Sequence, residues 1–148
     1  MDKIFAGVNV GRKNIVFGIS LFIVLGVVVG APLTVDLLGG SLFTGAQYQA
    51  WKVLHAYGVF VAFINFFFGF LVDRLSLSRQ QKEIASWSFM VAGLVGGIGR
   101  PALFLGSVPA GWAGYSISLI ETVGFVLGTL LFVRGRASQD ETTAKAAS

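Results

Sequence analysis

Residues 55–70 read HAYGVFVAFINFFFGF. Six of these sixteen residues are phenylalanine, yet the stretch opens with the only histidine of the chain and contains an asparagine. Its small and polar residues recur every three or four positions, which places them on one face of a helix: His55, Gly58, Ala62, Asn65 and Gly69. The other face carries Phe60, Phe63, Phe67 and Phe70. Helices in lipid associate through close contact of small residues and through hydrogen bonds, so we predict that the first face packs on protein and the second meets lipid.

The composition predicts that the whole chain is built from such segments. Of its 148 residues, 55% are hydrophobic and only 12% are charged, and the mean hydropathy is +0.78. A soluble domain of this size carries about twice that charged fraction. A membrane-spanning helix needs about 20 mostly apolar residues, and the sequence offers four such runs: 15–35, 53–72, 84–105 and 114–133. We therefore predict an all-α integral membrane protein, a four-helix antiparallel bundle formed by residues 1–136.

The positions of the basic residues predict the orientation. Nine of the eleven lie in the amino-terminal segment, the connection between the second and third runs, or the carboxyl-terminal segment: Lys3, Arg12, Lys13, Arg74, Arg79, Lys82, Arg134, Arg136 and Lys145. Because basic residues favour the cytoplasmic side, both termini are expected there, most simply in a bacterial inner membrane. The basic residues form no single stripe, so the pI of 9.8 is not taken to indicate nucleic-acid binding. The chain has no cysteine, which excludes disulfides and thiolate metal sites.

Two predictions concern the ends of the chain. The first run follows Arg12 and Lys13 and could be read as a secretory signal, but its 21 residues have spanning length, so we expect it to be retained. Residues 137–148, ASQDETTAKAAS, have no large apolar side chain and are expected to form a disordered polar tail.

Three ionisable residues fall within or close to the apolar runs. Arg100 and Glu121 are each expected about 8 to 10 Å below the outer surface, and His55 enters from the same side. Because an isolated charge in hydrocarbon is costly, we predict that Arg100 pairs with Glu121 near His55. This cluster is either a structural ion pair that fixes helix register or a functional pocket.

A lone inward histidine suits some ligands better than others. Structural zinc takes four protein ligands and catalytic zinc usually three, so a mononuclear zinc site is not expected. Haem iron needs only one axial imidazole, and chlorophyll could be held in the same way. Gly58 and Ala62, one and two turns further along the face of His55, would leave room for a flat macrocycle. The alternative is an interfacial histidine that bonds to a lipid headgroup or to Glu121.

The layout also resembles a known family. Four helices in a chain of this length, a histidine within WKVLHAYG at residues 51–58, and RLSLS at residues 74–78 resemble the small membrane isomerases that include styrene oxide isomerase and hydroxylaminobenzene mutase. The resemblance implies that His55 ligates haem b, that the protein is a homotrimer with haem between subunits, and that ferric iron acts as a Lewis acid. The family places an asparagine six residues after the histidine, where this chain has Val61. The styrene oxide enzyme also uses an acid and a tyrosine on its third helix, whereas residues 89–101, FMVAGLVGGIGRP, contain neither.

Two functional hypotheses follow. In the first, the protein is a membrane isomerase or mutase of small hydrophobic substrates that enter from the lipid. His55 would hold the iron, and Asn65, Arg100 and Glu121 would orient the substrate. In the second, the protein is a non-catalytic membrane subunit or scaffold whose small-residue faces dock partner helices. A transporter is less well supported, because unwound half-helices and inverted repeats are not evident in the sequence.

Overall fold

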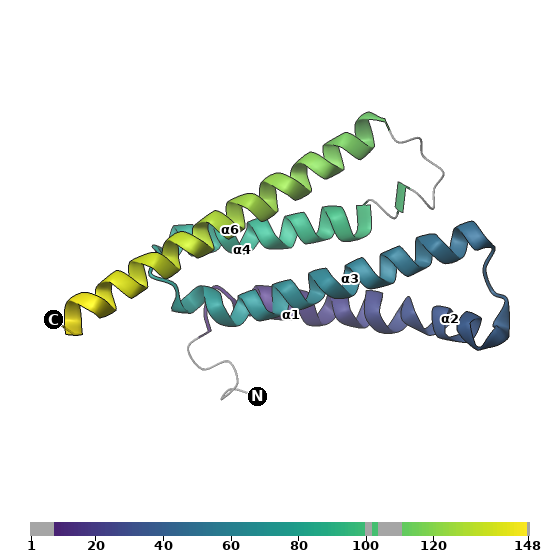
Figure 1. The fold of residues 1–148 in the computed structure, drawn as a ribbon, viewed down its shortest axis with the longest axis horizontal. Coiled ribbons are helices and arrows are strands. Elements are labelled where there is room, and N and C mark those ends of the chain that lie inside the picture. Colours follow the sequence, from purple (N-terminus) through teal and green to yellow (C-terminus); the bar gives the residue numbers. More distant parts are fainter. Residues whose placement is uncertain (1–7, 100–101, 104–110, 148) are drawn as a thin grey trace.

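The computed structural model of the protein describes residues 8–99, 102–103 and 111–147, but not the side chains of Trp112 and residues 137–147. Over these residues the chain is helical, without any strand, so the predicted all-α class is confirmed. The helices form two antiparallel hairpins that follow each other in the sequence (Figure 1).

The first hairpin consists of one long, interrupted helix and one continuous helix. Its segments are α1 (Arg12–Leu21), the π-helix η1 (Phe22–Val28), α2 (Gly30–Val35), the π-helix η2 (Asp36–Gly40) and α3 (Gly45–Leu71). In the turn before α3, Gly39 has a φ of +95°, a backbone conformation that favours glycine. The carboxylate of Asp36 then accepts the backbone N–H groups of Leu42 and Phe43, at 2.7 and 3.2 Å, and so closes the turn.

The second hairpin begins after a short connection at the end of α3. Its segments are the 3₁₀ turn η3 (Val72–Arg74), α4 (Arg79–Leu94), the π-helix η4 (Val95–Gly99) and α6 (Trp112–Ala147). Ser78 and Gln81 form a reciprocal capping box at the start of α4, with N–H to side-chain oxygen distances of 3.1 and 3.3 Å. Ser78 is the last residue of the RLSLS sequence, which gives part of that motif a structural role.

In the part of the chain that the structure describes, three helices are long and apolar enough to cross a membrane: Arg12–Gly40, Gly45–Arg74 and Ala113–Arg136. They correspond to three of the four predicted runs. The predicted run 84–105 extends past Gly99 into positions that are largely outside the described residues, so a fourth span stays a prediction. The helical backbone of α6 continues to Ala147, through the segment where the sequence predicts disorder.

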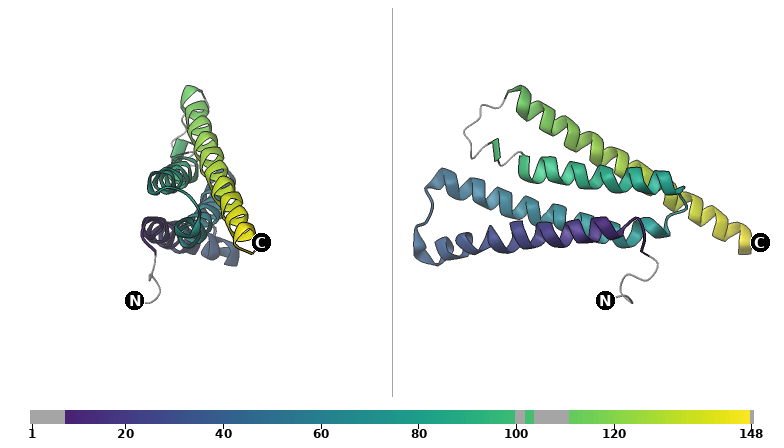
Figure 2. Two further views of the ribbon diagram at one scale, coloured as in Figure 1. Left: turned by 90° about the vertical axis from the view of Figure 1, so that its left-hand side faces the viewer. Right: turned by 180° about the vertical axis from the view of Figure 1, so that it is seen from behind.

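The four helices meet most closely at the end of the molecule that holds the connection between α3 and α4. A cluster of buried apolar residues there includes Phe68 of α3 and Phe89 of α4, whose ring centroids are 4.3 Å apart. From this end α6 diverges from α4, as Figure 1 and the view from behind in Figure 2 show. A second buried cluster, Leu21, Leu25, Val29, Val61 and Ala62, joins the two helices of the first hairpin.

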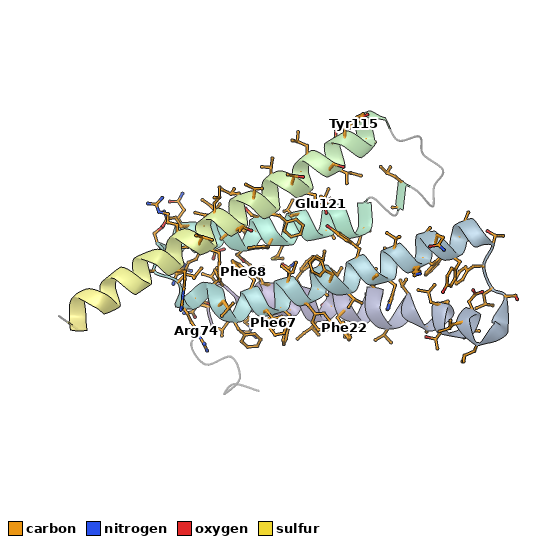
Figure 3. The ribbon with its side chains drawn as sticks, viewed as in Figure 1. Phe22, Phe67, Phe68, Arg74, Tyr115 and Glu121 are labelled. Atoms are coloured by element: carbon orange, nitrogen blue, oxygen red, sulfur yellow. The ribbon has the colours of Figure 1, made fainter. Side chains whose placement is uncertain are left out.

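The predicted inward face of α3 is confirmed, and three of the four phenylalanines predicted to face outward are exposed, whereas Phe70 is half-buried. Gly58, Ala62, Asn65 and Gly69 are buried, and His55 is half-buried. By contrast, Phe60, Phe63 and Phe67 keep 58%, 46% and 59% of their surface exposed, which suits side chains that meet lipid. Figure 3 shows the difference within one turn, since Phe67 points away from the second hairpin and Phe68 lies between the hairpins.

Candidate functional site

His55 points from α3 onto the first helix of its own hairpin. Its Nδ1 atom lies 2.9 Å from the backbone carbonyl oxygen of Leu25 in η1. The π-helical geometry makes this contact possible, because Val29 N–H donates five residues back to Val24 rather than four residues back to Leu25. The imidazole also lies against Gly30, where an added Cβ would be 2.8 Å from His55 Cε1.

The hydrogen bond to Leu25 selects a tautomer. A carbonyl oxygen only accepts, so Nδ1 must carry the proton, and Nε2 of the neutral imidazole then keeps its lone pair. Metal-bound histidines commonly have this arrangement, in which one ring nitrogen donates to a carbonyl and the other binds the metal. The contact therefore makes His55 suitable as a ligand through Nε2.

The small residues beside His55 do not leave open space within the chain. An added Cβ on Gly58 would lie 2.3 Å from Leu25 Cδ1, because the leucine side chain covers that glycine. Ala62 is 1% exposed, and its carbonyl oxygen would lie 2.7 Å from a Cβ on Gly18. The two residues thus let α1 and η1 approach α3 closely. A macrocycle held by His55 does not have the space between these helices.

A second polar contact lies on the other side of α3. The hydroxyl of Tyr57 donates to Oε1 of Glu121, which is 8% exposed on α6. The Glu121 side chain crosses the face of η4, where a Cβ on Gly96 would be 2.4 Å from its carboxyl carbon. Figure 3 shows Glu121 at the junction of α6 with the end of the α4–η4 segment. The pair therefore links α3 of the first hairpin to α6 of the second.

The structure separates His55 from Glu121. Residues 55 and 57 are about 200° apart around a helix, at about 100° per residue, so their side chains leave α3 on nearly opposite sides. His55 accordingly bonds to Leu25 and not to Glu121, which corrects the expectation of one cluster around the histidine. Arg100 lies outside the described residues, so its pairing with Glu121 stays a prediction.

Asn65 belongs to a third polar cluster, which is closed. Its side-chain oxygen accepts from Nδ2 of Asn14 at 3.1 Å, and the Asn14 amide also bonds to the side-chain hydroxyl and the carbonyl of Ser86. The Asn65 amide nitrogen donates to the carbonyls of Val61 and Phe89, at 3.1 and 3.4 Å. Asn14, Asn65 and Ser86 are each 0% exposed. This cluster joins α1, α3 and α4, and its geometry indicates helix registration rather than contact with a substrate.

Sequence reasoning missed three of these polar residues. Tyr57 was included only in an eight-residue motif, although a tyrosine beside a predicted site can donate to a buried acid. Asn14 lies near the start of α1, whereas Ser86 lies about two turns into α4. Asn14 and Ser86 could have been predicted from their position, because an amide and a hydroxyl on two helices at the same membrane depth can bond to each other.

Within the described residues, no group of three histidine, aspartate or glutamate side chains could hold a metal ion. Comparisons with known proteins found no matching family model, curated protein or solved structure. The resemblance to the membrane isomerases thus stays a prediction, and function has to be argued from the sites themselves.

Proposed function

We propose that the protein is a membrane-embedded isomerase or mutase of a small hydrophobic substrate, with a haem b held by His55. The observation that carries the proposal is the hydrogen bond from Nδ1 of His55 to Leu25, because it leaves Nε2 available as an axial ligand. The only histidine of the chain is thereby oriented by a backbone that is locally π-helical, a feature often found at functional sites.

The proposal includes a topology. All four helices cross the membrane as an antiparallel bundle, with both termini on the cytoplasmic side of an inner membrane. Support comes from contacts that hold Asn9 and Gly135 at the end of the molecule where α3 connects to α4. Asn9 N–H donates to Asp73 at 2.8 Å, and Ser76 N–H donates to the carbonyl of Gly135 at 3.2 Å. The basic residues near these contacts favour the cytoplasmic side.

The roles of the residues follow from their chemistry. A bound ferric haem would supply a Lewis acid that can polarise a substrate oxygen. Nε2 of His55 would ligate the haem iron, while the hydroxyl of Tyr57 and the carboxyl group of Glu121 would provide a donor and an acceptor in an apolar setting. Styrene oxide isomerase also uses an acid and a tyrosine, both from its third helix. In this protein the acid, Glu121, lies on α6 and the tyrosine, Tyr57, lies on α3.

His55 and the Tyr57–Glu121 pair lie on opposite sides of α3. We therefore propose that one complete site combines His55 of one copy of the protein with the Tyr57–Glu121 pair of a neighbouring copy. Side-by-side packing in a homo-oligomer, a trimer by the resemblance, would bring the His55 side of one copy toward the Tyr57 side of the next. A substrate dissolved in the bilayer could then reach the site between copies. Gly58 and Ala62 would not contact the haem directly. Their role is to let α1 and η1 pack closely against α3.

The second candidate is a non-catalytic membrane subunit or scaffold. It is favoured by one observation, that the room expected at Gly58 is occupied by Leu25. In that case, the glycine contacts serve helix packing alone, and His55 only ties α3 to η1.

An absorption spectrum separates the two candidates. Protein purified in detergent from cells supplied with haem is expected to show a Soret band that shifts on reduction with dithionite. His55→Ala is expected to lose the band and the activity on epoxides or arylhydroxylamines together, since no other histidine can replace the ligand. External imidazole should restore the band in this variant. A colourless wild-type protein, or an unchanged band in His55→Ala, would contradict the proposal and leave the scaffold.

The Tyr57–Glu121 pair is expected to affect turnover without affecting haem. Glu121→Gln keeps the size of the side chain that rests on Gly96 but removes the acid, so the Soret band should stay while the rate falls by about 100-fold, the typical contribution of an acid–base group. Tyr57→Phe should lower the rate similarly. Phe60→Tyr, on the exposed face of the same helix, is the control. If Glu121→Gln also removes the Soret band, the pair acts through structure and not on the substrate.

A further inference from the structure

A cavity of about 520 Å³ lies at the end of the molecule that holds the connection between α3 and α4. Its charged lining residues are Asp73, Arg79, Lys82 and Glu83. The cavity sits where the apolar helices begin, next to several further basic residues, so it belongs at the level of the lipid headgroups.

The two acids in this cavity already have partners. Asp73 accepts the backbone N–H groups of Asn9, Val10 and Gly11, at 2.8, 3.1 and 2.9 Å. Glu83 forms an ion pair with Lys13 of α1. Neither carboxylate is therefore paired with the two cations that line the same cavity.

The charges of Arg79 and Lys82 are not neutralised by an ion pair within the described part of the chain. The Lys82 ammonium group donates to the backbone carbonyl of Asp73 at 2.7 Å, a contact that does not cancel its charge. The Arg79 side chain is exposed and makes no hydrogen bond or ion pair with the described part of the chain. A guanidinium and an ammonium group on one cavity wall are the donors that phosphate oxygens prefer.

An apolar groove of about 650 Å³ begins beside this cavity and runs between α4 and α6. Glu83 lines both the cavity and the groove. Along α4 the groove extends from Gln80 to Val91, which is about 16 Å at about 1.5 Å per residue. One leaflet of a bilayer has about 15 Å of hydrocarbon, half of the about 30 Å core. The groove thus has the length of an acyl chain that starts at the headgroup level.

We propose that the cavity and the groove bind one anionic phospholipid. Its phosphate lies at Arg79 and Lys82, and one acyl chain lies along the α4–α6 groove and passes Trp87. Inorganic phosphate has the same oxyanion but would leave the groove empty. The proposal depends on membrane insertion and not on haem or catalysis, so the spectrum of His55→Ala does not test it.

Fluorescence of Trp87 provides the test, because this residue lines the groove. Substitutions Trp51→Phe and Trp112→Phe leave Trp87 as the only tryptophan. The full chain is placed in phosphatidylcholine vesicles in which a minor fraction of lipid carries bromine on the acyl chains. A brominated acyl chain in the groove quenches the fluorescence of Trp87. From this quenching we expect brominated phosphatidylglycerol to occupy the groove about tenfold better than brominated phosphatidylcholine, because each nearby Lys or Arg attracts anionic lipid.

The double substitution Arg79→Gln and Lys82→Gln should remove most of this preference. Arg74→Gln is the control, since Arg74 is at the same end of the molecule but does not line the cavity (Figure 3). Equal quenching by the two lipids, or the same loss in Arg74→Gln, would overturn the proposal. So would loss of the preference when inorganic phosphate replaces chloride at equal ionic strength, since the phosphate alone would then be the ligand. Helical circular dichroism of each variant verifies folding.

Discussion

Gly11→Ala is expected to destabilise the protein by about 3 kcal/mol or more, the upper range for forcing extra atoms into a packed contact. A Cβ at Gly11 would lie 1.8 Å from the carbonyl oxygen of Gly69, and a Cβ at Gly69 would lie 2.7 Å from the carbonyl oxygen of Gly11. The start of α1 and the end of α3 therefore meet backbone to backbone. A backbone carbonyl cannot rotate away as a side chain can, so the helices have to separate.

Separation of α1 from α3 would also weaken the hydrogen bonds between Asp73 and the backbone at the start of α1. Gly11 N–H donates to the Asp73 carboxylate at 2.9 Å, so a shift of α1 weakens the bonds that hold it to the end of α3. Thermal unfolding in detergent, followed by circular dichroism, measures the effect. Gly114→Ala is the matched control, because a Cβ there meets nothing within 4 Å, and alanine favours a helix by up to about 1 kcal/mol. Similar melting temperatures for the two variants would show that the close contact is not formed.

The faces of α3 could be predicted because a helix repeats every three to four residues whatever surrounds it. This periodicity placed Ala62 and Asn65 inward and Phe67 outward, as the structure has them. Polar partners across helices could not be predicted in the same way. Membrane depth gives the height of Glu121 on its helix but not its rotation, and rotation decides that Tyr57, two residues from His55, is the side chain it meets.

Backbone geometry was also beyond the reach of the sequence pattern. The contact of His55 with Leu25 depends on a π-helical segment, and side-chain periodicity does not reveal where a helix changes its hydrogen-bond pattern. The role of Gly58 shows a related ambiguity. A glycine on an inward face either leaves space for a ligand or admits a neighbouring helix, and only the position of Leu25 distinguishes the two.

The buried amide cluster connects α1 to the rest of the fold. Asn14 is the α1 residue that accepts from the Ser86 hydroxyl and donates to Asn65. Without the Asn14 amide, the buried side-chain oxygen of Asn65 would lose this partner. Burial of an unpaired polar atom costs about 1 to 3 kcal/mol, so the cluster is expected to stabilise the packing of α1 against α3 and α4.

Asn14→Leu is accordingly expected to destabilise the protein by about 2 kcal/mol, because it leaves polar atoms of both Asn65 and Ser86 without a partner. Asn14→Leu combined with Asn65→Leu should cost clearly less than the sum of the single substitutions, since the double variant removes both members of one hydrogen bond. Asn9→Leu is the control, because Asn9 is exposed and bonds through its backbone. A double-mutant cycle of unfolding in detergent measures the coupling, which in membrane proteins averages about 0.6 kcal/mol for such bonds. Strict additivity would mean that the two amides do not bond to each other.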